Sequence, residues 1–472
     1  MKIKMTNNKI SLILLNIIVT VLELFFISTS SYSLDFLPTL SIMVLFNFFI
    51  QLVTMRILNM PYKSFFFLFI CLLYVFHFGQ VFCTALLDED PSGVTNMLKT
   101  VLIEGEYVIK LFVIIIGTIN SFFIGGVFQS STTDNYIDTY HTEEDKKIDR
   151  TCFLLGITLF LISTPLRLYV DIQQLTAAFL GGYFSAIEVT VSGVVSCIAG
   201  FWYIAVLFLS ISIQDNTKRK VFISICMLYM LLSMFTGNRG HQLVNILAIV
   251  LVLSYLKNEK VHLRKIIKLV IIGFMGLIVI NLIFRMRIYG ISYMFSNFEA
   301  LLQETINNNV VSQTLYELGG TIKTPYLVVK GLGSKLNPFF GETFFRSLLV
   351  CIPDVTGLLS ENTNMAILGR VLNKAYNISA LGGSFIGEIY YSFQQLYFVV
   401  SFLFGCIYYK ISANIIFAIK SKENWYVCKY LPFLVYSLWW VRDSFCGMLR
   451  PVIWIAIIYI VVRRVVSNKQ AS

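Results

Sequence analysis

Long apolar segments separated by short polar ones dominate the pattern of this chain. A helix that crosses a membrane needs about 20 mostly apolar residues, and twelve segments approach or reach that length. The pattern therefore predicts an all-α, polytopic integral membrane protein with about 12 transmembrane helices. The expected spans lie near residues 10–28, 36–57, 64–87, 107–128, 151–170, 192–214, 221–236, 239–256, 266–285, 388–409, 430–447 and 451–466.

The longest connection, between the ninth and tenth expected helices, divides the chain. It carries an amphipathic stretch from Phe295 to Ile306 and further apolar runs between Gly and Pro turns. Long ordered connections in compact proteins are usually functional. We therefore expect an N-terminal membrane region (1–285), a folded extracytoplasmic cap loop (286–387) containing short helices, and a C-terminal membrane region (388–472).

Composition supports the same class of protein. Hydrophobic residues make up 57% of the chain and charged residues only 13%, against about 45–50% and about 25% in soluble domains. So little charge excludes a water-soluble enzyme and a disordered chain. The nine cysteines form no CxxC pair and lie mostly in apolar runs, so they indicate core packing and not a disulfide framework or metal site.

Basic residues set the expected orientation. Placing the N-terminus in the cytoplasm puts most of the 37 Lys and Arg residues in cytoplasmic segments, as the positive-inside rule requires. Both termini are then cytoplasmic, and the first segment is an uncleaved anchor. The net charge of +11 is explained by anionic lipid and does not require nucleic acid as a partner.

A set of arginines is expected on the outer face, where positive charge is otherwise scarce. Guanidinium groups bind phosphate through a rigid fork of donors and stay charged at any relevant pH. The set therefore favours a pyrophosphate-binding site, although each arginine taken singly could also reach toward lipid headgroups. Its members are Arg239, Arg285, Arg287, Arg346, Arg370, Arg442 and Arg450.

Two candidates for proton transfer accompany these arginines. Glu388 stands near the start of an apolar helix, where a carboxylate is costly unless solvated or hydrogen-bonded. It could accept a proton or hold an arginine, or simply complement the helix dipole. His241 follows the turn at Gly237 and Asn238, which either connects two spans or fixes His241 and Arg239 at a cavity mouth. The four histidines show no metal-ligand spacing.

Two short motifs resemble those of a known family. The stretch LGGSFIGEIYYSF at residues 381–393 supplies Gly383, Ser384, Glu388, Tyr390 and Phe393. This pattern resembles the signature of Wzy-type O-antigen and capsular polysaccharide polymerases, in which it opens a helix after a large outer loop. The segment 236–240 resembles the family's Gly-(Ser/Asn)-Arg-Gly element. Gln at positions 394 and 395 departs from the Gly or Asn more usual there.

The resemblance implies a glycosyltransferase of the bacterial cytoplasmic membrane that takes part in O-antigen, capsular or exopolysaccharide synthesis. Such enzymes move a growing glycan from undecaprenyl pyrophosphate to a new lipid-linked repeat unit. Arginines would stabilise the departing pyrophosphate, with Glu388 as the first candidate base, His241 as the second, and Asn238 and Tyr390 as further site residues. No cofactor or metal is expected. The implied partners are the lipid-linked oligosaccharide, membrane lipid, and flippase and chain-length regulator proteins.

Two alternatives remain open at this point. A lipid-linked oligosaccharide flippase would have a similar number of spans, but it would need a charged cavity between two comparable halves. An O-antigen-type ligase shares the leaving group and much of the geometry of a polymerase. The identity of the sugars and of their linkage is also open.

Overall fold

The computed structural model describes most of the chain as helices. The described residues are 6–87, 96–102, 104–130, 144–189, 191–234, 239–256, 276, 296–307, 309–352, 360–378, 381–421 and 424–468, and they contain no β-strand. The all-α prediction is therefore confirmed.

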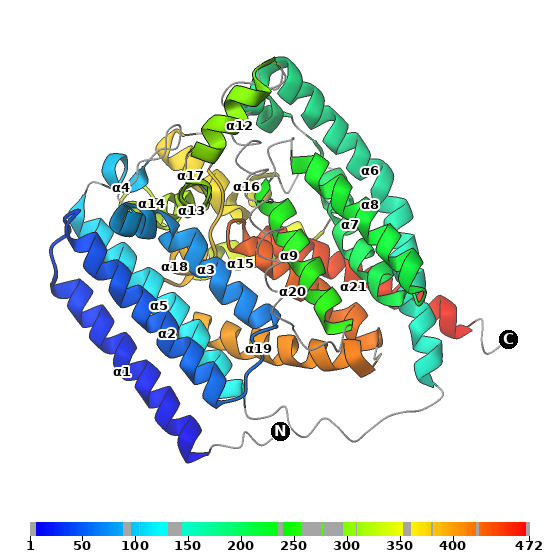
Figure 1. The fold of residues 1–472 in the computed structure, drawn as a ribbon, viewed down its shortest axis with the longest axis horizontal. Helices are drawn as coiled ribbons and strands as arrows, with labels where there is room; N and C mark the ends of the chain where they lie inside the picture. The colour runs from blue at the N-terminus through cyan, green and yellow to red at the C-terminus, as the bar shows by residue number, and fades with distance from the viewer. Residues whose placement is uncertain are drawn as a thin grey trace.

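Two groups of helices stand side by side in Figure 1. The first contains α1 (Asn7–Thr29), α2 (Phe36–Ile57), α3 (Phe65–Phe82, continued by the π-helical turn η1, Cys83–Leu87) and α5 (Gly105–Gln129). The second contains α6 (Glu144–Glu188), α7 (Gly193–Ser212), α8 (Asn216–Ser233) and α9 (Arg239–Leu256). C-terminal helices α19 (Tyr397–Ser421), α20 (Asn424–Trp440) and α21 (Phe445–Asn468) pack against both groups.

Eight helical segments are long and apolar enough to cross a membrane, among the residues that the structure describes. They match the expected spans at 10–28, 36–57, 64–87, 107–128, 151–170, 192–214, 388–409 and 451–466. Helices α8, α9 and α20 coincide with three further expected spans but are shorter or more polar. The expected span at 266–285 lies outside the described residues.

Local sequence explains where several helices begin. Ser64 precedes α3, and its hydroxyl accepts a hydrogen bond from the amide of Phe67 (3.1 Å). Asp215 caps α8 by accepting from the amides of Thr217 and Lys218. Such caps satisfy backbone donors that have no partner inside the first turn.

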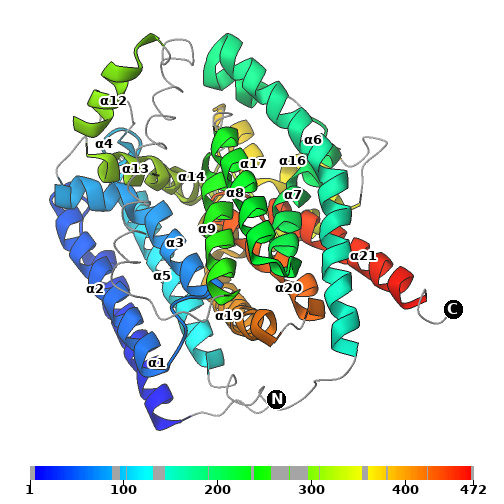
Figure 2. The same cartoon turned by 45° about the vertical axis from the view of Figure 1, so that its right-hand side comes forward.

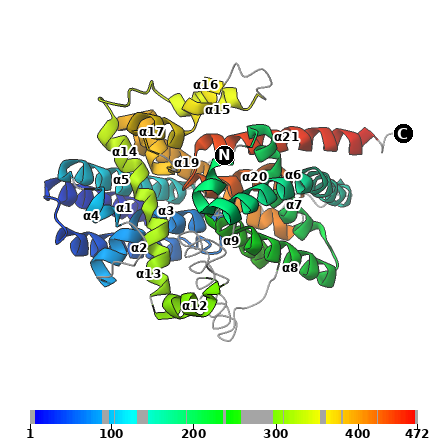
Figure 3. The same ribbon diagram turned by 90° about the horizontal axis from the view of Figure 1, so that it is seen from above.

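The long connection consists largely of short helices. They are α12 (Phe298–Asn307), α13 (Val310–Gly319), α14 (Lys323–Gly331), α15 (Glu342–Val350), α16 (Ser360–Ala366) and α17 (Leu368–Tyr376). In Figure 2, α13 and α14 lie across the upper ends of α3 and α5. Seen from above, α15 and α16 lie at one edge, beside α17 and α21 (Figure 3). Two hydrogen bonds join the end of α15 to α21, from Arg450 to the Val350 carbonyl (3.0 Å) and from Trp454 to the Cys351 carbonyl (2.7 Å).

A buried polar cluster lies among the apolar side chains of α1, α2 and α5. The Glu23 carboxyl accepts hydrogen bonds from the side-chain amides of Asn47 (2.8 Å) and Asn120 (3.2 Å), and Gln51 donates to Asn120 (2.9 Å). All four side chains are buried. Removing water from these groups is costly unless they bond to one another, so the cluster fixes how the three helices face each other.

Two glycines allow α5 and α19 to approach closely. A Cβ at Gly125 would overlap the carbonyl oxygen of Phe402, and a Cβ at Gly405 would overlap that of Phe122. Small residues at such crossings let helix backbones meet and are common in membrane bundles. This contact joins the N-terminal group of helices to the helix that follows the family-like motif.

We predict that Gly405→Ala lowers thermal stability because the added methyl group meets backbone atoms that cannot rotate away. Overpacking of this kind costs about 1–3 kcal/mol. The measurement is the melting temperature of purified protein by fluorescence-detected size exclusion. Gly200→Ala is the matched control, since a Cβ there meets no atom within 4 Å. Equal melting temperatures for the two variants would contradict the close contact.

Candidate active site

A polar cavity of about 560 Å³ lies between the second group of helices, the C-terminal helices and the cap. Its walls come from α6, α7, α9, α16, α17, α20 and α21, so segments far apart in the chain meet there. Among the side chains that line it are three arginines, an aspartate and a histidine: Arg167, Arg370, Arg450, Asp443 and His241. Three of these, His241, Arg370 and Arg450, belong to the set predicted from the sequence.

A short turn between α20 and α21 carries Asp443 to this cavity. The turn is tight because the Arg442 amide donates to the Trp439 carbonyl (3.0 Å). Gly383 packs directly against it, and a Cβ at Gly383 would overlap the Asp443 carbonyl oxygen. The family-like motif therefore needs glycine at this position because the turn occupies the space of a side chain.

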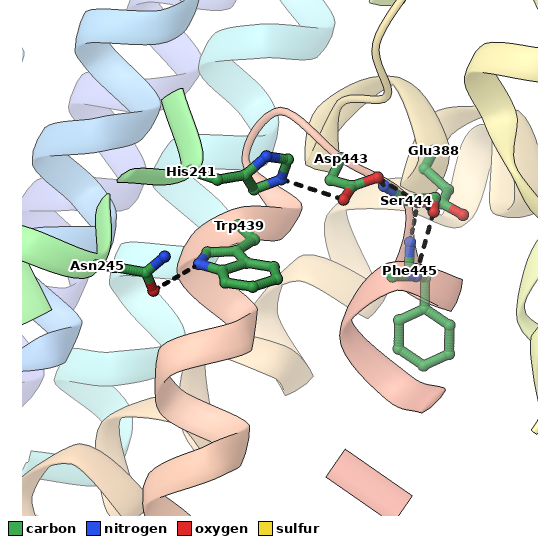
Figure 4. Close-up of polar contacts among 8 residues, drawn as sticks. His241, Asn245, Glu388, Trp439, Asp443, Ser444 and Phe445 are labelled. Atoms are coloured by element: carbon green, nitrogen blue, oxygen red, sulfur yellow. Dashed lines mark hydrogen bonds and ion pairs between the residues drawn. The ribbon is translucent and has the colours of Figure 1, made fainter. Parts of the chain in front are cut away.

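His241 and Asp443 form a polar pair at the cavity wall (Figure 4). The distance from His241 Nε2 to Asp443 Oδ2 is 3.3 Å, and the two side chains are 33% and 31% exposed. The imidazole meets the Trp439 ring edge-on at a centroid distance of 4.9 Å. Trp439 is in turn fixed by a hydrogen bond to Asn245 (3.0 Å). The imidazole thus has a defined orientation, and its partner is an acid.

The environment of Asp443 keeps its carboxyl ionised. Burial works against ionisation, but hydrogen bonds from His241 and from the backbone and hydroxyl of Ser444 outweigh it and lower the pKa of Asp443 below its ordinary value. The charge of Asp443 is therefore constant over the neutral pH range.

Arg370 and Arg450 bring positive charge to the cavity without an acidic partner among the described residues. Arg370 Nη1 donates to the amide oxygen of Asn364 (2.9 Å). Arg450 Nε donates to the Val350 carbonyl (3.0 Å). Both contacts are to neutral acceptors, so the charge of each guanidinium remains available to an anion in the cavity.

Arg167 also lines the cavity, and the sequence analysis did not select it. It forms a buried ion pair with Asp171 (2.7 Å) one helical turn later, and Tyr229 and Ser233 donate to the same carboxylate. Its guanidinium lies over the Tyr203 ring, 5.2 Å from the centroid. The sequence feature that could have identified Arg167 is an arginine four residues before an aspartate inside an apolar span. Because Asp171 neutralises it, Arg167 contributes less charge to the cavity than Arg370 or Arg450.

The remaining predicted arginines do not line this cavity in the described part of the chain. Arg346 is held on α15 by Glu342 (2.8 Å) and Asn362 (2.6 Å). The Arg442 guanidinium lies 6.0 Å from the centre of the Phe76 ring. Residues 285 and 287, the turn residue Asn238 and the side chain of Arg239 lie outside what the structure describes.

Glu388 lies behind the Asp443 turn and not at the cavity. Its side chain is fully buried on α18 (Phe385–Phe393), and Ser384 caps this helix. Carboxylate oxygen Oε2 accepts from the Trp440 indole (2.7 Å) and from the Phe445 amide (2.6 Å). These donors stand at the two ends of the turn, so Glu388 clamps the segment that presents Asp443 (Figure 4). Tyr390, two residues further along, is buried and meets Tyr397 edge-on at a centroid distance of 5.8 Å.

Comparison with known proteins decides the family. The family model for O-antigen polysaccharide polymerase Wzy matches residues 10–470. The chain belongs to this family. Membership confirms the resemblance seen in the motifs and identifies the protein as an integral membrane polymerase of O-antigen repeat units.

No curated protein and no solved structure matches the chain. The arrangement of residues around the cavity must therefore be interpreted from its own geometry. Within the described ranges, no three His, Cys, Asp or Glu side chains gather closely enough to hold a metal ion. Positive charge in the cavity of this Wzy-family protein comes from arginine side chains.

We predict that Glu388→Gln retains polymer formation, whereas Glu388→Ala loses most of it. The Gln carbonyl oxygen can still accept from Trp440 and Phe445, but Ala leaves both buried donors without a partner, at a cost of about 1–3 kcal/mol each. The measurement is polymer length on a gel together with the melting temperature. Loss of polymer in a stably folded Glu388→Gln protein would instead indicate that the carboxylate itself takes part in proton transfer.

Proposed function

We propose that this Wzy-family protein transfers a growing glycan from undecaprenyl pyrophosphate to the terminal sugar of a new lipid-linked repeat unit. The observation that carries the proposal is the convergence of Arg370, Arg450 and the His241–Asp443 pair on one cavity. Two guanidinium groups without acidic partners suit a diphosphate, and a paired histidine suits proton transfer from a sugar hydroxyl.

The reaction forms one glycosidic bond and breaks one bond to phosphate. The acceptor hydroxyl oxygen attacks the anomeric carbon of the donor, and the bond from that carbon to the pyrophosphate oxygen breaks with its electron pair. Negative charge grows on the pyrophosphate as it leaves. Arg370 and Arg450 stabilise that charge more strongly than the charge of the bound substrate, and this difference accelerates the reaction.

His241 is the residue that we propose as the base. With Nε2 donating to Asp443 (3.3 Å), the imidazole takes the hydroxyl proton at Nδ1 as the new bond forms. Asp443 orients the ring and stabilises the imidazolium that results. Glu388, the first candidate from the sequence, is assigned a positioning role because its carboxylate accepts the hydrogen bonds that hold the Asp443 turn.

Two observations support placing this cavity at the outer face of the bacterial cytoplasmic membrane. The long connection supplies α16 and α17 to the cavity. Short segments rich in basic residues, such as Lys218, Arg219 and Lys220, lie at the opposite ends of the helices. In addition, α1 begins at the end of the bundle away from α16 and α17 (Figure 1). The lipid-linked oligosaccharide, flippase and chain-length regulator proteins are the partners proposed for this face.

We predict that Arg370→Ala and Arg450→Ala each reduce chain extension by about a hundredfold, as expected when a charge-stabilising donor is removed. The assay uses purified protein in nanodiscs with lipid-linked repeat units extracted from cells that lack the polymerase gene. Lys374→Ala is the matched control, because Lys374 is an exposed cation on the same helix as Arg370 but does not line the cavity.

Normal polymer from the Arg370→Ala and Arg450→Ala double variant would refute the pyrophosphate site. Accumulation of long lipid-linked chains that fail to reach their final acceptor would instead support a ligase.

We predict that Asp443→Asn and His241→Gln lower kcat by about 10²–10⁴-fold, with smaller effects on KM. Asparagine keeps the size of Asp443 but cannot stabilise the imidazolium. The measurement is the initial rate of repeat-unit addition as a function of substrate concentration. A variant that changes KM alone would place the pair in binding and not in proton transfer.

A further inference from the structure

A second hollow, of about 360 Å³, lies at the opposite end of α18 from the Asp443 turn. Its walls come from α5, from the segment after α14 and from the 3₁₀ turn η5 (Gln394–Leu396). We call it the carboxamide groove, because most of its polar lining consists of side-chain amides. Its polar members are Lys110, Asn337, Tyr390, Gln394 and Gln395.

The polar side chains of this groove make no hydrogen bond to any residue that the structure describes. Elsewhere in the cap, similar amides are used for structure: Asn362 accepts from Arg346 and Asn364 accepts from Arg370. Most of the polar side chains of the groove are exposed, so their donors and acceptors are open to a ligand, and a few polar groups set in a concave surface are typical of a ligand site. The volume also falls within the range of small-ligand pockets, which is about 300–1,000 Å³.

The backbone at Gln394 supplies an independent observation. This residue has φ 44° and ψ −117°, a conformation that glycine adopts readily and other residues rarely do. It is held there by its surroundings: the Gly341 amide donates to the Ser392 carbonyl (2.7 Å), and the rings of Phe340 and Phe344 pack on Phe393. Strain at a residue with a side chain is characteristic of functional sites, where that side chain is needed.

Helix α18 joins the groove to the proposed reaction site. The residues before it contact the Asp443 turn, and η5 follows its last residue. Its nine residues span about 13 Å at 1.5 Å per residue. An extended substrate whose reacting end lies at the cavity could therefore place other groups at the groove.

The chemistry of the lining indicates which groups these are. Each carboxamide offers both donors and acceptors, which matches neighbouring sugar hydroxyls. Phosphate, by contrast, is better matched by a cluster of cations; the groove lining contains no arginine, and Lys110 stands there beside three carboxamides. We propose that the carboxamide groove binds sugar residues of a lipid-linked substrate, at a site separate from the arginines that hold its diphosphate. This inference rests on the proposed function, because that function supplies the substrate.

The test separates the sugars from the lipid diphosphate. Mild acid releases the free repeat-unit oligosaccharide from lipid-linked material extracted from cells that lack the polymerase gene. Binding of this oligosaccharide and of undecaprenyl pyrophosphate is then measured with the full-length protein in nanodiscs. We expect the Asn337→Ala and Gln395→Ala double variant to weaken oligosaccharide binding by about tenfold or more, with unchanged undecaprenyl pyrophosphate binding. Arg370→Ala should show the reverse pattern.

Gln394→Gly distinguishes a binding role from a structural one. Glycine relieves the backbone strain, so the melting temperature should stay the same or rise, while oligosaccharide affinity falls severalfold because the side chain is gone. Gln303→Ala, an exposed glutamine on α12 outside the groove, is the matched control. Lower stability with unchanged oligosaccharide affinity in Gln394→Gly would overturn the proposal.

The two proposals fail in different ways. Unchanged oligosaccharide binding in all groove variants would overturn the carboxamide groove even if polymer forms normally. Absence of polymer from the unmodified protein with intact lipid-linked substrate would overturn the proposed function. In that case, oligosaccharide binding that is lost in the groove variants would still support the groove as a saccharide site.

Discussion

The clamp formed by Glu388 is the interaction on which the geometry of the candidate active site depends. One carboxylate oxygen accepts hydrogen bonds from Trp440 and from the amide of Phe445, so the end of α20 and the start of α21 are held together. The turn between them then has one conformation, and that conformation presents Asp443 to His241. A buried carboxylate is costly, and these two donors offset part of that cost inside an apolar bundle.

The arginines in and near the cavity differ in the partners that their guanidinium groups contact. Arg167 and Arg346 have acidic partners and stabilise the walls, whereas Arg370 and Arg450 contact neutral oxygens. A guanidinium that already has a carboxylate adds little attraction for a second anion, because the two charges largely cancel beyond their contact. The number of arginines near a site is therefore a poor guide to its affinity for diphosphate, and their partners are a better one.

The position of the family-like motif, between the cavity and the carboxamide groove, explains several of its residues in physical terms. Its first residues include Gly383, which gives the Asp443 turn room, and Ser384, which caps α18. Glu388 follows within the helix, and the end of the motif leads into the strained Gln394. One short helix thus links the proposed bond-forming site with the carboxamide groove. A rigid helix at this place keeps the separation between the cavity and the groove constant.

The sequence by itself determined the class of the protein, because the length and spacing of apolar segments are local properties that the lipid environment imposes. It also determined most helix positions, the short helices of the long connection and the family motif. Three of the residues that it proposed for a site, His241, Arg370 and Arg450, line one cavity in the structure.

The tertiary structure alone decided which side chains meet. Glu388 looked like a base because a carboxylate near a helix start suggested access to substrate, yet the fold covers it with Trp440 and the Phe445 backbone. The sequence did not distinguish Asp443 from other acids of the chain. In the structure, the turn places Asp443 Oδ2 3.3 Å from His241 Nε2. Such partnerships join residues 202 positions apart in the chain, and a linear pattern carries no information about contacts at that separation.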